Sequence, residues 1–221
     1  MDEMVKLKKD RSCERVLRTL LACVASLVAG LQLWLSVRDA RENGNSFALG
    51  VADYLRFFST LTNIFIAFVA IAPNVQIRFR GFRWFATPTA AGCAATSGVL
   101  VCAGYHFLLR GSLQGLQGFS DLLLHYVAPA IMVVYAFHIL RANRLPWRAP
   151  LLWGMYPVAY FIYVLTRGAL TGSYPYWFMN VPAIGYVSTI LHAFGLLGAF
   201  LLIGFALIGI SHHFGVRDAL N

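Results

Sequence analysis

Residues 184–210 read IGYVSTILHAFGLLGAFLLIGFALIGI, a run that contains no Asp, Glu, Lys or Arg. A helix needs ~20 such residues to cross the hydrocarbon core of a bilayer. Stretches of about this length recur along the chain, and we predict six spans, at 16–37, 54–72, 87–109, 119–140, 149–167 and 184–210. Uninterrupted apolar runs favour helices, because the strands of a spanning barrel are short and alternate in polarity. The sequence therefore predicts an all-α, polytopic membrane protein, a six-transmembrane-helix bundle.

The composition agrees with this fold class. Of the 221 residues, 59% are hydrophobic and 12% are charged, and the mean hydropathy is +0.66. Soluble domains carry about 25% charged residues, so a soluble protein is excluded. The connections are short, which favours antiparallel neighbouring helices in a single domain, 1–221. A basic tail (1–15) precedes a first helix that lacks a signal-peptide cleavage site, and 38–53 and 168–183 are the predicted extracytoplasmic loops.

The formal net charge of +9 follows the membrane topology and does not indicate nucleic-acid binding. With a cytoplasmic N-terminus, thirteen of the 18 Lys and Arg residues lie inside: Lys6, Lys8, Lys9, Arg11, Arg15, Arg18, Arg78, Arg80, Arg83, Arg141, Arg144, Arg148 and Arg217. The other five lie outside: Arg38, Arg41, Arg56, Arg110 and Arg167. This asymmetry predicts that both termini are cytoplasmic. The inner basic residues then face anionic membrane lipids.

The cysteines predict neither a disulfide framework nor a metal site. Their spacing matches no metal-ligand pattern, and the four are Cys13, Cys23, Cys93 and Cys102. Three of them lie in apolar spans, where a thiol behaves as a small hydrophobe. No metal or organic cofactor is predicted.

Thr60 and His125 are the two residues that suggest chemistry. Each lies within a predicted span, where polar and ionisable side chains are costly and mark candidate functional sites. Thr60 is about 10 Å below the outer entrance of its helix and His125 about 9 Å below the entrance of its own, at ~1.5 Å per residue. The two side chains are therefore expected at one level of the membrane, on helices that run in the same direction.

Polar neighbours accompany both residues. Arg56, Thr60 and Asn63 follow i, i+4, i+7 spacing, so a continuous helix would place them on one stripe. Asp121 and His125 are four residues apart and can touch. Pro129 removes the N–H that would bond the His125 carbonyl, so a bend is expected there.

Structural interpretations of these residues stay open. Thr60 alone is typical of a membrane threonine that bonds its own i−4 carbonyl. His125 alone fits an interhelical hydrogen bond. Arg56 is long enough to reach the outer interface, and Asp121 suits the dipole at a helix start.

Together the same residues suggest acyl transfer. A threonine hydroxyl becomes a nucleophile when a neighbouring base takes its proton, and His125 is a base of the right type. Asp121 is a candidate for orienting the imidazole. Asn63 and Arg56 are candidate donors to the oxyanion of a tetrahedral intermediate.

Residues 57–63 resemble the threonine motif of the animal androgen-induced and androgen-dependent membrane hydrolases. That motif has an aromatic residue, an aliphatic one, the threonine, two apolar positions and an asparagine. Here Ser59 stands at the aliphatic position and Thr62 within the apolar pair. The resemblance implies a six-helix enzyme that cleaves fatty acid esters of hydroxy fatty acids, with Thr60 as the nucleophile.

Residues 124–129 resemble the second motif of these enzymes, a histidine followed four residues later by a proline, which implies that His125 is catalytic. Nearly the whole chain resembles a bacterial branch of predicted six-transmembrane-helix proteins, notably at 144–148 and 152–172, and the branch implies a bacterial cytoplasmic membrane. In that branch the outer loop continues Pro-Phe-Leu-Asp after the aromatic positions. The corresponding residues here are Trp177-Phe178-Met179-Asn180, so an asparagine stands in place of the aspartate. Tyr174, Tyr176 and Asn180 are the candidate residues of that loop.

The sequence thus leads to two hypotheses. The first is an intramembrane threonine hydrolase for a lipidic ester, in which Thr60 and His125 react near the extracytoplasmic side and Arg167 joins Arg56 and Asn63 in positioning the substrate. The second is a non-catalytic protein that binds or transports a small amphiphile or ion in a polar cavity. Neither hypothesis predicts an oligomeric state.

Overall fold

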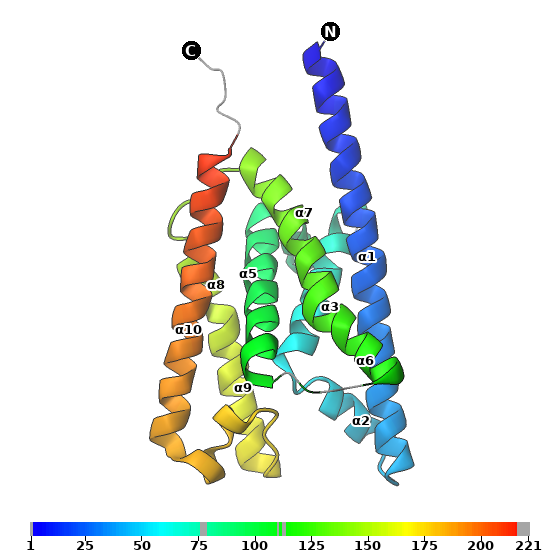
Figure 1. Cartoon of the computed structure of the whole chain (residues 1–221), viewed down its shortest axis with the longest axis vertical. Helices are drawn as coiled ribbons and strands as arrows, with labels where there is room; N and C mark the ends of the chain where they lie inside the picture. The colour runs from blue at the N-terminus through cyan, green and yellow to red at the C-terminus, as the bar shows by residue number, and fades with distance from the viewer. Residues whose placement is uncertain (1, 76–78, 110, 112–113, 216–221) are drawn as a thin grey trace.

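Long helices follow the apolar stretches of the chain in the computed structural model, which describes residues 2–75, 79–109, 111 and 114–215 (Figure 1). The α-helices are α1 (Asp2–Glu42), α2 (Phe47–Tyr54), α3 (Phe58–Ile71), α4 (Arg80–Arg83), α5 (Pro88–Gly104), α6 (Gly115–Leu122), α7 (Ala128–Ala142), α8 (Ala149–Trp153), α9 (Met155–Thr171) and α10 (Val181–His213). Short 3-10 or π turns are η1 (Ala72–Asn74), η2 (Trp84–Ala86), η3 (Tyr105–Leu109), η4 (Leu123–Val127) and η5 (Trp177–Met179). No strand occurs in the described residues, which confirms the all-α prediction.

Six spans were predicted, and the described residues contain five helices that are long and apolar enough to cross a membrane. A sixth is present if a bent pair of helices is counted as one span. Within the described residues, the stretches long and apolar enough to cross a membrane are Ser12–Glu42, Pro88–Leu109, Gly115–Ala142, Ala149–Thr171 and Val181–His213. The bent pair joins Phe47–Tyr54 to Phe58–Asn74 at 82°. The start of α1 and the end of α10 lie at the same end of the bundle (Figure 1).

The sequence-based boundaries were wrong at the second predicted span. Residues 54–72 do not form one helix, because the chain breaks at 55–57 and α3 starts in a new direction. The predicted loop 38–53 is also largely helical, since α1 continues to Glu42 and α2 begins at Phe47. Ser46 stabilises that start by accepting a hydrogen bond from the Leu49 N–H at 3.2 Å.

Two other predicted segment boundaries also differ from those in the structure. The predicted basic tail 1–15 is helical from Asp2 onward, because α1 extends through it. The predicted loop 168–183 shortens at both ends, since α9 runs to Thr171 and α10 starts at Val181. Among the arginines used for the topology, Arg78, Arg110 and Arg217 lie outside the described residues.

Small side chains place α5 at the centre of the bundle, between α7 and α10 (Figure 1). Its middle is rich in Ala, Gly, Ser and Thr, which allow neighbouring helices to approach closely, as is typical within membranes. A Cβ atom on Gly92 would lie 2.5 Å from the buried indole of Trp153. Thr96 and Ser97 bond carbonyls four residues back in the same helix, so their hydroxyls leave no unpaired donor.

Gly92→Ala is expected to destabilise the bundle by about 1–3 kcal/mol, because the new methyl group overpacks the contact with Trp153. Gly30→Ala is the matched control, since a Cβ on Gly30 meets no atom within 4 Å. The alanine should leave the stability there unchanged or raise it by about 0.5–1 kcal/mol through helix propensity. Thermal unfolding in detergent micelles measures both. Equal melting temperatures for the two variants would contradict the close packing of α5.

Candidate functional site

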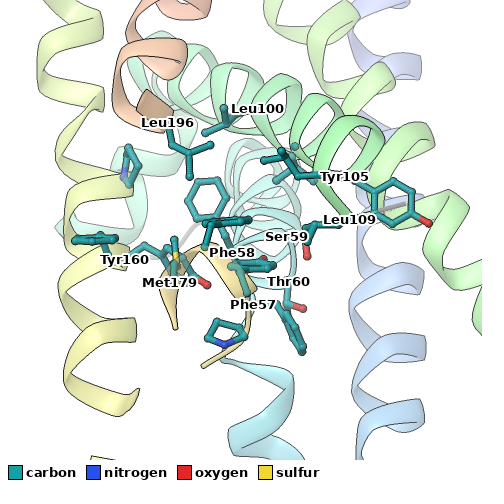
Figure 2. Close-up of a pocket in the computed structure, with 18 of the residues that line it drawn as sticks. Phe57, Phe58, Ser59, Thr60, Leu100, Tyr105, Leu109, Tyr160, Met179 and Leu196 are labelled. Atoms are coloured by element: carbon teal, nitrogen blue, oxygen red, sulfur yellow. The ribbon is translucent and has the colours of Figure 1, made fainter. Parts of the chain in front are cut away.

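A cavity of about 490 Å³ opens among the helices (Figure 2). Its wall is formed by α1, α3, α5, η3, α6, η4, α9, α10 and the connection between α9 and α10. Its volume lies in the range that accommodates a small organic ligand. Most of the wall is apolar. The polar and phenolic side chains on it are Gln32, Ser59, Thr60, Tyr105, Asp121, His125, Tyr160 and Tyr176.

Thr60 lies on the cavity wall in the first turn of α3 and is 2% exposed (Figure 2). The structural interpretation, a bond to its own i−4 carbonyl, is wrong here. That carbonyl belongs to Arg56 and accepts a hydrogen bond from the Tyr160 hydroxyl at 2.8 Å. No described residue forms a hydrogen bond with the Thr60 hydroxyl.

Three helical threonines of the protein do form the bond that Thr60 lacks, whereas Thr62 in α3 lies 3.4 Å from the Tyr156 hydroxyl instead. Thr96, Thr171 and Thr189 each donate to the carbonyl four residues earlier, at 2.8, 2.8 and 2.9 Å. Thr60 cannot, because the break at 55–57 puts its i−4 carbonyl outside the helix. The break therefore leaves Thr60 with a hydroxyl that makes no hydrogen bond within the described residues and faces the cavity.

His125 lies on the same cavity wall, in the π turn η4, and is 8% exposed. The turn ends immediately before Ala128 and Pro129, so the proline perturbs the helix by widening its preceding turn. The predicted contact with Asp121 is confirmed, since Nδ1 lies 3.0 Å from the Asp121 carboxylate and 3.0 Å from its carbonyl oxygen. The Tyr105 ring stacks on the imidazole with centroids 3.9 Å apart.

These contacts determine the tautomer of His125. Both groups at Nδ1 are acceptors, so Nδ1 carries the proton. The neutral imidazole then has its lone pair on Nε2, which is the nitrogen that acts as a base. Thr60 and His125 line the same cavity, although no hydrogen bond joins them.

Asn63 does not line the cavity, and its amide protons are already used. Its Nδ2 donates to the Ser59 carbonyl at 2.9 Å and to the Leu124 carbonyl at 3.0 Å, while the Oδ1 has no partner among the described residues. The second bond ties α3 to the residue that precedes His125. Asn63 therefore positions the two helices, and its predicted role as an oxyanion donor has no free N–H to serve it.

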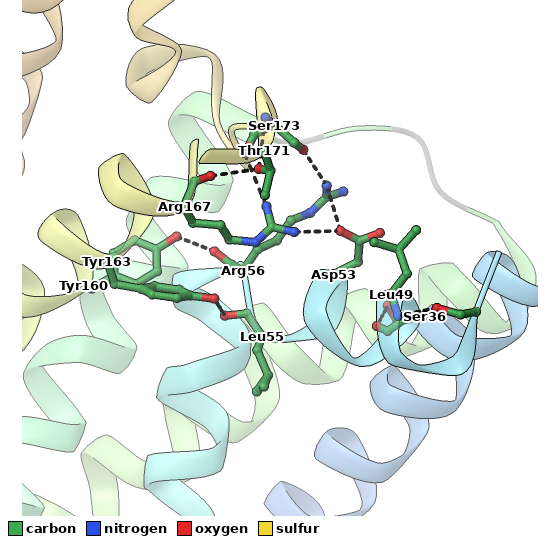
Figure 3. Close-up of polar contacts among 12 residues, drawn as sticks. Ser36, Leu49, Asp53, Leu55, Arg56, Tyr160, Tyr163, Arg167, Thr171 and Ser173 are labelled. Carbon is green, nitrogen blue, oxygen red and sulfur yellow. Dashed lines mark hydrogen bonds and ion pairs between the residues drawn. The ribbon is translucent and has the colours of Figure 1, made fainter. Parts of the chain in front are cut away.

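Arg56 and Arg167 form a separate cluster outside the cavity wall (Figure 3). Asp53 Oδ1 lies 3.2 Å from Arg56 Nη1 and 3.1 Å from Arg167 Nη2. Both arginines also donate to Ser173. Arg56 Nη1 bonds the hydroxyl at 3.2 Å, and Arg167 Nη1 bonds the carbonyl oxygen at 3.3 Å. The predicted stripe of Arg56 with Thr60 is wrong, because Arg56 precedes the break. The cluster holds the connection between α9 and α10 against the end of α2.

Tyr176 is the outer-loop candidate that reaches the cavity. Its hydroxyl oxygen accepts a hydrogen bond from the Phe58 N–H at 3.0 Å. Burial raises the pKa of Tyr176, so the phenol keeps its proton at neutral pH. The other two candidates do not line the cavity: the Tyr174 ring packs on Gly168, and the Asn180 carbonyl accepts from the first turn of α10.

Sequence reasoning missed Gln32 and Tyr105. Gln32 comes from α1 and accepts a hydrogen bond from the buried Ser120 hydroxyl at 2.8 Å, beside Asp121. An amide within an apolar span was a signal that could have identified it. Tyr105 gave no such signal, because a tyrosine near the end of a span is an ordinary interfacial residue. Among the described residues, no group of three His, Cys, Asp or Glu side chains gathers as metal ligands.

No family model, no curated protein and no solved structure matches this chain. The resemblance to the threonine hydrolases therefore stays a prediction, as do the catalytic roles of the cavity residues. What the fold provides is a buried hydroxyl and an oriented imidazole on one cavity wall.

Asp53→Asn is expected to loosen the connection between α9 and α10, because the two guanidinium groups lose the carboxylate that they share. Hydrogen–deuterium exchange should become several-fold faster in residues 172–180. Glu42→Gln is the matched control, since Glu42 pairs with Arg38 on the exposed end of α1. Unchanged exchange in residues 172–180 of the Asp53 variant would show that the cluster does not hold this segment.

Proposed function

We propose that this protein is an intramembrane hydrolase that cleaves a lipidic ester, with Thr60 as the nucleophile and His125 as the general base. One observation carries the proposal. Thr60 is a buried residue whose hydroxyl has no hydrogen-bond partner among the described residues and opens onto a cavity that it shares with His125. A hydroxyl that makes no hydrogen bond within the protein and faces a cavity is available to a ligand bound there.

The orientation of His125 supports the base role. A carboxylate that accepts Nδ1–H leaves Nε2 as the basic nitrogen and stabilises the imidazolium that forms when Nε2 takes a proton. Asp121 supplies that carboxylate at 3.0 Å. The stacked ring of Tyr105 restricts rotation of the imidazole.

The reaction follows from these parts. Nε2 of His125 takes the Thr60 proton while Oγ1 bonds the ester carbon, and the carbonyl π electrons move to oxygen. The oxyanion then collapses, the bond to the alcohol oxygen breaks, and His125 returns its proton to that oxygen. Water attacks the acyl-threonine in the same manner, releasing a carboxylic acid and restoring the Thr60 hydroxyl.

The position of the cavity supports a lipidic substrate. Val158, Ile190 and Phe194 form part of its wall and are exposed on the outside of the bundle, where acyl chains of a bilayer would lie. An amphiphile can therefore reach Thr60 from the lipid without passing through water. A fatty acid ester of a hydroxy fatty acid is the substrate class implied by the resemblance.

The binding or transport of an amphiphile is the second candidate function. The largely apolar cavity and the missing hydrogen bond between Thr60 and His125 favour it. Catalytic hydrogen bonds are often long in the absence of substrate, so this geometry is compatible with both functions.

A fluorophosphonate probe tests the nucleophile. Wild-type protein in detergent micelles should be labelled, Thr60→Ala should not, and His125→Ala should react about 100-fold more slowly because it lacks the general base. Ser59→Ala is the matched control, since its hydroxyl lies beside Thr60 on the same wall and should be dispensable. Labelling that survives Thr60→Ala refutes the assignment. An unlabelled wild type that hydrolyses no ester but binds amphiphiles supports the second function.

The proposed topology has both termini in the cytoplasm and the cavity nearer the outer face. A variant that retains only Cys13, which is exposed near the start of α1, should react with a membrane-impermeant maleimide only after the cells are permeabilised. Asn45→Cys in a cysteine-free background is the matched control, because Asn45 is exposed in the turn between α1 and α2 and should react in intact cells. The reverse pattern would invert the topology.

A further inference from the structure

The first turn of α3 lies inside the bundle, where a helix start is unusual. Phe57, Phe58, Ser59 and Thr60 all line the cavity, so the N-terminus of the helix opens onto it (Figure 2). The first N–H groups of any helix have no intrahelical acceptor. They carry partial positive charge, and this charge is strongest where water is excluded.

These N–H groups are only partly satisfied. The Phe58 N–H donates to the Tyr176 hydroxyl at 3.0 Å, and Phe57 gives no side-chain cap. Neither the N–H nor the hydroxyl of Thr60 forms a hydrogen bond with any described residue. Thr60 is 2% exposed, so a buried polar side chain without a partner stands at a helix start that lacks its own cap.

Tyr176 adds a side-chain donor to the same place. Its oxygen accepts the Phe58 N–H, and the Ser59 and Tyr160 hydroxyls lie beside it. Its own proton can turn from these neutral neighbours to an anionic oxygen in the cavity, because a charged acceptor forms the stronger hydrogen bond. Because burial raises the pKa of Tyr176, it remains a neutral donor at physiological pH. The ring stacks on Phe178 with centroids 5.1 Å apart, which restricts the position of the hydroxyl.

The charged alternatives are unsuitable. Arg56 and Arg167 share Asp53 and Ser173 and do not line the cavity. The Asn63 amide donates both of its protons to backbone carbonyls. An anionic oxygen beside Thr60 would therefore meet the α3 backbone and Tyr176.

We propose that the first turn of α3 and the Tyr176 hydroxyl form an oxyanion-binding site. The site binds the oxygen that becomes negative when Thr60 attacks an ester carbonyl, a part that rests on the proposed function. After hydrolysis it binds the carboxylate of the released fatty acid. Carboxylate binding needs no turnover, so it can be measured whether or not the protein is an enzyme.

Turnover tests the transition-state part. Tyr176→Phe should lower kcat for a fatty acid ester by about 10²–10³-fold, the usual effect of removing one oxyanion donor. KM should change less than threefold, because the donor acts mainly on the oxyanion and only weakly on the ground-state carbonyl. Tyr174→Phe is the matched control and should retain the wild-type kcat, since Tyr174 lies in the same segment outside the cavity wall. A Tyr176→Phe enzyme with the wild-type kcat overturns this part.

Calorimetry in detergent micelles tests the binding part, with oleate and oleyl alcohol as probes. Wild-type protein should bind oleate at least tenfold more tightly than the alcohol, and Tyr176→Phe should reduce this preference while Tyr174→Phe retains it. The comparison of the two probes on wild-type protein requires no variant. Equal binding of oleate and oleyl alcohol overturns the site even if the protein hydrolyses esters. A preference for oleate without ester hydrolysis or labelling keeps the site and refutes the proposed function.

Discussion

The geometry of the cavity depends on one hydrogen bond, from the Tyr160 hydroxyl to the Arg56 carbonyl at 2.8 Å. A break in a helix at membrane depth leaves backbone groups unpaired, and each is costly unless another group satisfies it. Tyr160 satisfies the acceptor at the break, and Tyr176 accepts the first N–H beyond it. With the break stabilised from α9 and its following segment, α3 can begin inside the bundle. Thr60 then occupies a first turn, where its hydroxyl has no carbonyl of its own to bond.

Two residues connect this break to the imidazole. Asn63 joins α3 to the Leu124 carbonyl, and Asp121 orients His125 from one turn away. The distance between hydroxyl and base is thus governed by a buried amide that touches neither a substrate nor the cavity. From the sequence alone, such a residue cannot be distinguished from a catalytic one, because both are polar side chains in apolar segments where burying a polar group costs free energy. Contacts, and not polarity, separate the two roles.

Hydropathy was sufficient for the all-helical fold and for five of the long apolar helices, because both depend on the length of the apolar runs. The i, i+4 contact of Asp121 with His125 was likewise predictable from spacing. The break at 55–57 was not, because residues 54–72 are long and predominantly apolar and contain neither proline nor glycine before Pro73. Its stabilising partners are tyrosines more than a hundred residues away in sequence. Two errors in the predicted site, the stripe of Arg56 with Thr60 and the back-bonded Thr60, follow from the break that these long-range contacts stabilise.

The open side of the cavity, at Val158, Ile190 and Phe194, changes what can select a ligand. In water, burying an acyl chain in an apolar cavity is strongly favourable. In a bilayer the chain already has an apolar solvent, so moving it into the protein gains little, and every lipid tail competes for the same wall. Discrimination must then come from the polar end of the ligand, at the few hydrogen-bonding groups around Thr60. For the proposed membrane-embedded cavity, the surrounding lipids would act as competing ligands as well as a solvent.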